Sequence, residues 1–165
     1  PTLDVSGVHE EYNLLLNDES IQNPFIITSG LVKIIRQHTQ NCTSSEEKAL
    51  SIYDWIEQNI QYGRSYGNDW YKNTREVLST GKGVCGEMAF VYIAMARSCG
   101  LRSAYVSVSV DCRGQRVHHG CAIVDVESRD ILVDPAYHQF DVRHRRYKIL
   151  TDSEVLEKFN QWRRA

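Results

Sequence analysis

Apolar residues recur every three or four positions through the first half of the chain, a spacing typical of amphipathic helices. Ser44 precedes Glu47 by three positions, the capping-box pattern that begins a helix. A long apolar run ends at Gly100, a residue suited to stopping a helix. Helices are therefore predicted at 29–40, 44–60, 75–78 and 88–99. The glycine-rich polar stretch 61–69 is expected to be a loop.

The period changes to two after Gly100. Within 103–110, Ala104, Val106, Val108 and Val110 alternate with more polar residues, which predicts a strand. Further strands are predicted at 117–126 and 131–134, the last stopped by Pro135. Short turns join the three strands, so an antiparallel meander is expected. Thr151 and Glu154 repeat the capping-box pattern, and a closing helix should follow them.

Helices followed by strands predict an α+β fold with a buried helix packed on a small antiparallel sheet. The length of 165 residues suits one domain, and 42% hydrophobic with 24% charged residues is typical of a globular chain. We therefore expect a single domain over 1–165, with 1–28 as an N-terminal extension of uncertain structure.

Charge and composition exclude several classes of partner. Lys plus Arg number 19 and Asp plus Glu 21, so the net charge of −2 argues against a nucleic-acid partner. No apolar run reaches the roughly 20 residues of a membrane span. A basic stretch followed by an apolar one is not seen at the start, so no signal peptide is expected and a cytoplasmic location is favoured. The pattern does not define an oligomeric state.

Five cysteines are an odd number in a chain long enough to fold without disulfides, so at least one thiol is expected to be free. Cys85 stands out because the buried helix begins just after it. A thiol there lies at the positive end of the helix dipole, which lowers its pKa and favours the nucleophilic thiolate. Gly83 and Gly86 allow a sharp turn and leave room for a substrate carbonyl.

A nucleophilic thiolate needs a base and a group that orients the base. His119 on the second strand and Asp134 at the end of the third are 15 positions apart, so they can lie side by side. The adjacent His118 points to the opposite face by strand alternation and is expected to face solvent.

These segments resemble the transglutaminase-like superfamily. The run Gly81-Lys82-Gly83-Val84-Cys85-Gly86-Glu87 before an apolar helix is similar to its nucleophile segment. The runs beginning at His119 and at Leu132-Val133-Asp134-Pro135 are similar to its histidine and aspartate strands. The likeness covers about 46–137. It implies a papain-like core in which Cys85 is the nucleophile, His119 the base and Asp134 the orienting carboxylate.

The resemblance implies three alternative functions. The first is a cysteine-dependent protease or amidase that forms a thioester acyl-enzyme on a protein or peptide substrate. The second is acyl transfer from glutamine to an amine, as in transglutaminases. The third is a binding or scaffold module that keeps the fold without catalysis. No cofactor or metal is implied, and strand alternation scatters Cys112, His118, His119 and Cys121, which argues against zinc.

Secondary hypotheses concern three further residues and one basic run. Such folds use a second oxyanion donor upstream of the nucleophile, for which Tyr62 and Trp70 are candidates. Cys121 replaces the aromatic residue usual two positions after the histidine, and it shares a face with His119. It is either a small buried residue or the partner of Cys85 in a reversible disulfide. The basic run 143–148 is interpreted as a solvated face or, alternatively, a dock for an acidic substrate or partner.

Overall fold

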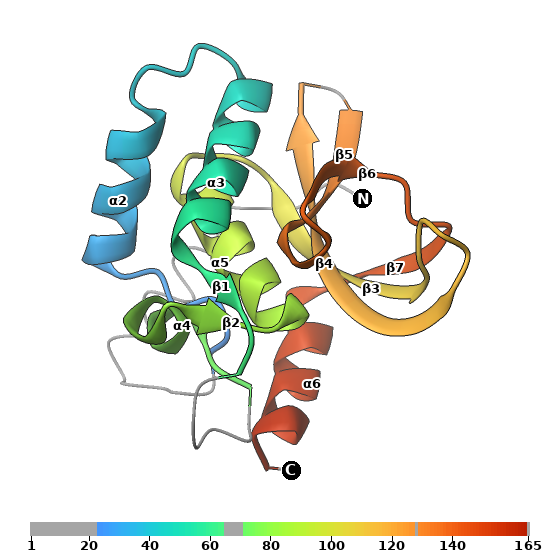
Figure 1. Cartoon of the computed structure of the whole chain (residues 1–165). Coiled ribbons are helices and arrows are strands. Elements are labelled where there is room, and N and C mark those ends of the chain that lie inside the picture. Colours follow the sequence, from blue (N-terminus) through green and yellow to red (C-terminus); the bar gives the residue numbers. More distant parts are fainter. Residues whose placement is uncertain (1–22, 65–70, 128, 165) are drawn as a thin grey trace.

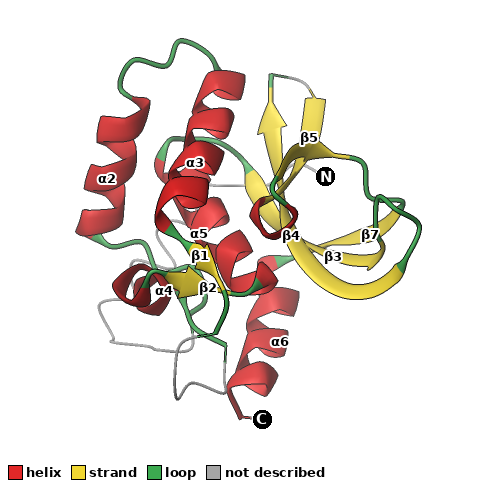
Figure 2. Cartoon of the chain, in the orientation of Figure 1, coloured by secondary structure: helices red, strands yellow, loops and turns green. Residues whose placement is uncertain are grey.

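The computed structural model describes residues 23–64, 71–127 and 129–164. A group of helices lies on one side and a curved sheet on the other (Figures 1 and 2). The helical side comprises α2 (Ser29–Thr39), α3 (Ser45–Asn59), α4 (Thr74–Thr80) and α5 (Cys85–Ser98). The closing helix α6 (Asp152–Arg164) packs beside the sheet at β3 and β7. None of the helices in the described part is long and apolar enough to cross a membrane.

Helix α5 is central because it packs against the other helices on one side and against the sheet on the other. Every residue from Gly86 to Arg97 is buried, which agrees with the apolar run between the two charged residues Glu87 and Arg97. Around it, Phe25, Ile52 and Phe159 complete the main hydrophobic core. The nucleophile candidate is thus placed at the start of a helix that is buried along most of its length.

Local capping explains where the helices begin. The Ser44 side chain accepts the Glu47 N–H at the start of α3, as predicted, but the Glu47 carboxylate accepts the Thr43 N–H rather than closing the box. At α6 the box is complete, because Thr151 and Glu154 each accept the other's backbone N–H through the side chain.

The sheet has five antiparallel strands in the order β6-β5-β4-β3-β7. The three central strands, β3 (Ser103–Val110), β4 (Arg116–Val126) and β5 (Arg129–Asp134), confirm the predicted meander. The edge strands β6 (Gln139–Val142) and β7 (Arg146–Leu150) were not predicted. The first three residues of β7 are exposed, as loop residues usually are, so the sequence does not indicate a strand at this edge of the sheet.

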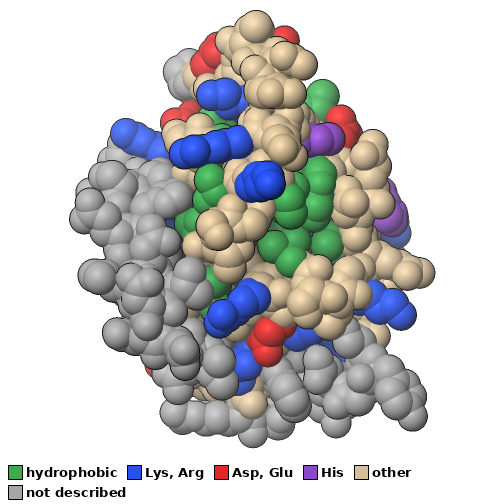
Figure 3. Space-filling model, turned by 90° about the vertical axis from the view of Figure 1, so that its left-hand side faces the viewer, with side chains coloured by type: hydrophobic (Ala, Val, Ile, Leu, Met, Phe, Trp, Pro, Cys, Tyr) green, Lys and Arg blue, Asp and Glu red, His purple; other side chains and the backbone are tan. Residues whose placement is uncertain are grey.

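Two more short strands lie inside the segments read as loops. β1 (Gln61–Tyr62) pairs in parallel with β2 (Lys82–Gly83), directly before α5. The far face of the large sheet carries a second apolar cluster that includes Val106, Cys121 and Leu132. Figure 3 shows the outer helical side, where Lys and Arg side chains surround exposed hydrophobic atoms.

Candidate active site

Cys85 is the first residue of α5, and the carboxylate of Glu87 holds the chain around it. One oxygen of the buried Glu87 accepts the Val84 N–H at 2.9 Å, and the other accepts the Lys72 N–H at 2.6 Å. The carboxylate therefore ties the loop before α4 to the first turn of α5. This link fixes the position of the thiol relative to the neighbouring loop.

The environment of Cys85 favours its thiolate. Burial raises the pKa of the thiol, but hydrogen bonds from the His119 side chain and from the Gly120 and Gly86 backbone outweigh it and leave the pKa lowered. The start of α5 adds the positive end of the helix dipole. The lowered pKa increases the fraction of Cys85 present as thiolate near neutral pH.

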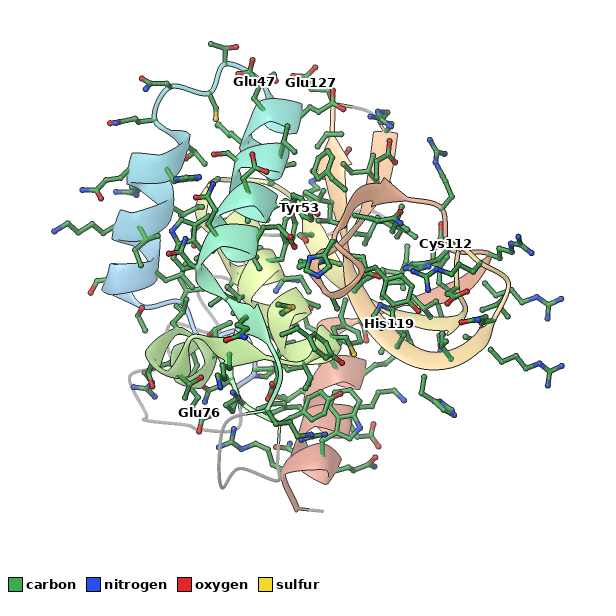
Figure 4. The ribbon with its side chains drawn as sticks, viewed as in Figure 1. Glu47, Tyr53, Glu76, Cys112, His119 and Glu127 are labelled. Atoms are coloured by element: carbon green, nitrogen blue, oxygen red, sulfur yellow. The ribbon has the colours of Figure 1, made fainter. Side chains whose placement is uncertain are left out.

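His119 hydrogen bonds to Asp134 as the strand spacing predicts. Its Nε2 lies 2.6 Å from Oδ2 of Asp134, and Asp134 is fully buried. Burial lowers the pKa of His119, but the bonds to Asp134 and Cys85 raise it overall to about 9. Because Nε2 of His119 bonds to the Asp134 carboxylate, Nδ1 is the ring nitrogen available to the Cys85 thiol. In Figure 4, His119 lies between the helices and the outer turns of the sheet.

A second histidine, His144, shares the same carboxylate oxygen. Its Nε2 lies 2.7 Å from Oδ2 of Asp134, while its Nδ1 accepts the Cys112 N–H at 3.0 Å. Since Nδ1 is an acceptor, Nε2 carries the proton and the ring is neutral. The sequence analysis missed His144 because it lies in the basic run assigned to solvent. Its one sequence signal is alternation, since Val142 and His144 are buried whereas Arg143 and Arg145 are exposed.

Tyr137 covers the His119 ring. The two rings stack with centroids 4.4 Å apart, and the Tyr137 hydroxyl donates to Asp111 at 2.8 Å. The Tyr137 N–H also donates to Oδ1 of Asp134 at 3.1 Å. Asp134 therefore accepts from three donors, which holds its carboxylate in one orientation.

Two glycines bring aromatic side chains up to the thiol. A Cβ on Gly120 would collide with the Tyr105 hydroxyl, and one on Gly86 would lie 2.8 Å from the Tyr71 ring. Tyr71 and Tyr105 consequently form part of a cavity of about 350 Å³ that opens beside Cys85. The remaining lining residues are Ser107, His118, His119, Gly120, Leu150, Lys158 and Trp162.

The two oxyanion candidates have different outcomes. Tyr62 lies in β1 with 54% of its surface exposed, and burial together with the nearby Cys85 charge raises its pKa. Tyr62 is therefore close enough to Cys85 for the thiolate charge to affect its pKa, and its role as an oxyanion donor stays a prediction. Trp70 lies outside the described residues.

Cys121 is fully buried in the cluster on the far face of the sheet, and both it and Cys85 are free thiols. Burial, Asp134 and Cys85 raise the pKa of Cys121 well above its usual value. These features suit a packing residue, and the redox hypothesis stays a prediction.

Only one group of potential metal ligands occurs among the described residues: His119, Asp134 and His144, whose ligand atoms lie within 4.8 Å of one another. Hydrogen bonds already join these atoms, and the proton on Nε2 of His144 would have to leave before a metal could bind there. The hydrogen-bonded arrangement accounts for the short distances.

Residues 32–135 match the family model described as the transglutaminase-like superfamily, a span of well over half the chain. A search of curated protein sequences finds no significant match.

Solved structures show the same fold at low identity. A candidate cysteine protease from Cytophaga hutchinsonii is 18% identical with a TM-score of 0.62, covering 76% of this chain and 44% of that one. A transglutaminase is 16% identical with a TM-score of 0.54, covering 84% and 40%. LapG of Legionella pneumophila is 14% identical with a TM-score of 0.53, covering 99% and 98%. The chain thus spans less than half the length of the first two proteins.

Proposed function

Because the chain belongs to the transglutaminase-like superfamily, we propose that it is a cysteine-dependent hydrolase of amide bonds in peptides or proteins. Cys85 is the nucleophile, His119 the general acid and base, and Asp134 the orienting carboxylate. The observation that carries this proposal is geometric: Cys85, the first residue of α5, lines one cavity with His119, and Nε2 of His119 lies 2.6 Å from Oδ2 of Asp134. In keeping with this arrangement, the pKa of Cys85 is lowered and that of His119 is raised to about 9. Such a pair favours thiolate and imidazolium at neutral pH.

The geometry supports a two-stage reaction. The Cys85 thiolate attacks the amide carbon, a C–S bond forms, and the carbonyl oxygen takes the negative charge. Backbone N–H groups at the start of α5 are placed to stabilise that charge, with Tyr62 as the further candidate. When the tetrahedral species collapses, the C–N bond breaks and His119 gives its proton to the departing amine.

Hydrolysis of the thioester completes the cycle. Water attacks the acyl carbon while His119 accepts its proton, and the C–S bond then breaks to release the acid and restore the Cys85 thiolate with a protonated His119. Asp134 stabilises the imidazolium in both stages and keeps Nδ1 directed at the sulfur. An amine in place of water would give acyl transfer from the same thioester.

Alkylation by iodoacetamide tests the proposal without knowledge of the substrate. Cys85 should react at near-neutral pH much faster than the other four cysteines, and His119→Ala should remove that selectivity. His138→Ala is the matched control, because His138 is exposed and pairs with Glu57 on the molecular surface. Slow, uniform labelling of all five thiols would favour a non-catalytic module.

The reaction itself is tested with a mixture of quenched fluorescent peptides. Cleavage by the wild-type protein and its loss in Cys85→Ala are expected. Adding an excess of a primary amine distinguishes transfer, because a transglutaminase would join the amine to glutamine peptides instead of cleaving them.

A further inference from the structure

The cavity beside Cys85 adjoins a second cavity of about 410 Å³ on the sheet, and His118 forms part of both walls. The second cavity is lined by Ser109, Val110, Arg116, Val117, His118 and Arg146. Together they form what we call the sheet groove, running from Cys85 past His118 to the outer ends of β3, β4 and β7. The catalytic steps above make no use of it.

Strand pairing explains why basic residues meet in this groove. On β3, Val110 pairs with Arg116 of β4 on one side and with Arg146 of β7 on the other. The three residues are therefore abreast, at a point where the register of both pairings shifts, and all three line the second cavity. The register shift between Val108 and Val110 adds one residue to β4 between Arg116 and His119, and His118 and Arg116 line the same cavity there. Lys158 enters from α6 and lines the cavity at the Cys85 end.

The sheet groove is lined by positively charged side chains although the whole chain has a net charge of −2. Neither cavity has an Asp or Glu in its lining. Within the described residues, Arg116, Arg146 and Lys158 form no ion pair, whereas their neighbour Lys148 pairs with Glu154 at 3.2 Å. The adjoining segments 112–118 and 142–148 contain six basic residues and no acidic one: Arg113, Arg116, Arg143, Arg145, Arg146 and Lys148. In Figure 4, nitrogen-tipped side chains extend outward from this end of the sheet.

We propose that the sheet groove binds an acidic polypeptide segment of the substrate, with its carboxylates against Lys158, His118, Arg116 and Arg146. This inference rests on the proposed function, because the groove matters only if Cys85 attacks a bound peptide. A local basic lining in a chain of net charge −2 attracts carboxylates without making the whole protein a polyanion binder. The Tyr71 and Trp162 rings supply apolar surface for the intervening parts of the segment.

The test uses short peptides that carry a central chloroacetamide group and alkylate Cys85. Three peptides differ only in the flanking residues, which are Glu, Gln or Lys on both sides. One exposed ion pair contributes at most about a fivefold preference. With two or three such pairs in the groove, the Glu peptide should react about tenfold faster than the Gln peptide at low salt. The Lys peptide should react slowest, and added salt should reduce the differences.

Variants locate the effect. Arg116→Gln/Arg146→Gln and, separately, Lys158→Gln should each lower the ratio of Glu to Gln rates severalfold. Lys33→Gln/Arg36→Gln is the matched control, since it removes two basic residues from α2 on the opposite, helical side and should leave the ratio unchanged. Neutral iodoacetamide should react with Cys85 of Lys33→Gln/Arg36→Gln at the wild-type rate, and thermal unfolding verifies that the fold of the groove variants is intact.

The outcomes separate the two proposals. Slow reaction of wild-type Cys85 with iodoacetamide would refute the proposed function itself. Fast reaction with iodoacetamide but equal rates for the Glu and Gln peptides would overturn the groove assignment alone. A Glu preference that survives in the groove variants would overturn it too. So would protection of Cys85 by heparin as effective as by an unreactive Glu peptide, because the surface would then be a general polyanion site.

Discussion

Replacing Asp134 by Asn probes the hydrogen bonds that hold His119. The carboxylate accepts three donors: Nε2 of His119, Nε2 of His144 and the Tyr137 N–H. An amide has one oxygen and one NH₂ group, so at least one donor must face another donor. His144 cannot relieve the conflict by changing tautomer, because the Cys112 N–H occupies its Nδ1. His119 can, by placing its proton on Nδ1 next to the sulfur, which removes its function as a base.

The structure sets the magnitude. The pKa of His119 is about 9 against an ordinary 6.5, which corresponds to about 3 kcal/mol in favour of the imidazolium. Burial opposes this shift, and the Asp134 hydrogen bond is the largest cause that raises the pKa. Its loss should cost about 2 kcal/mol, or about thirtyfold in the population of the thiolate–imidazolium pair. The pKa of His119 should then fall toward its ordinary value.

The assay is the rate of Cys85 alkylation by iodoacetamide as a function of pH. In the wild-type protein the thiolate should persist from below the ordinary thiol pKa upward, and its imidazolium partner should be present until the pH rises through about 9. In Asp134→Asn the rise in rate should move to higher pH, because the thiolate loses its cationic partner. Peptide cleavage by the wild-type protein should decline above about pH 9, where His119 can no longer protonate the leaving amine.

Asp130→Asn is the control for this experiment, since Asp130 lies on the same strand but is exposed. Circular dichroism and thermal unfolding would verify that both variants are folded. A pH profile of folded Asp134→Asn that superimposes on the wild-type profile would refute the reasoning, because the carboxylate would then have no influence on the pair.

Three further substitutions test the packing around the site. His144→Phe leaves the part-buried Cys112 N–H without its acceptor and removes one of the two donors to Oδ2 of Asp134, so urea denaturation should show a loss of about 2 kcal/mol; an unchanged midpoint would argue against the shared carboxylate. Gly120→Ala places a methyl group against Tyr105, so thermal unfolding should show the free energy of unfolding lowered by about 1–3 kcal/mol. Gly30→Ala is its control and should be neutral in the same assay, because the nearest atom to the added methyl group is 3.8 Å away. Glu87→Gln offers one acceptor to two backbone N–H groups, so it should destabilise the fold by about 2 kcal/mol and slow Cys85 alkylation. Wild-type stability together with a wild-type alkylation rate would contradict the role of this carboxylate in linking α5 to the loop before α4.

Much of the central architecture could be predicted because its patterns are long and regular. The apolar run of α5 and the alternation in β3 each extend over eight or more residues, and both segments form the predicted elements. The spacing of His119 and Asp134 on neighbouring strands was enough to predict that they lie side by side.

The parts that escaped prediction depend on tertiary contacts. β6 and β7 are short strands at the two edges of the sheet, so each is paired on one side only. Their side chains show little alternation between buried and exposed positions. His144 stands among arginines and becomes part of the site only because the chain folds its buried ring onto Asp134. The aromatic walls formed by Tyr71 and Tyr105 depend on the absence of a Cβ at two distant glycines, which no local pattern reveals.

The central claim is that Cys85 exists as a thiolate paired with protonated His119. The most direct measurement is the ultraviolet absorbance of the thiolate during a pH titration, taken as the difference between the wild-type protein and Cys85→Ala. The account predicts that the thiolate signal appears well below the ordinary pKa of a thiol, and that in His119→Ala it appears only at higher pH. A signal that emerges at the ordinary thiol pKa, and is the same with or without His119, would contradict it.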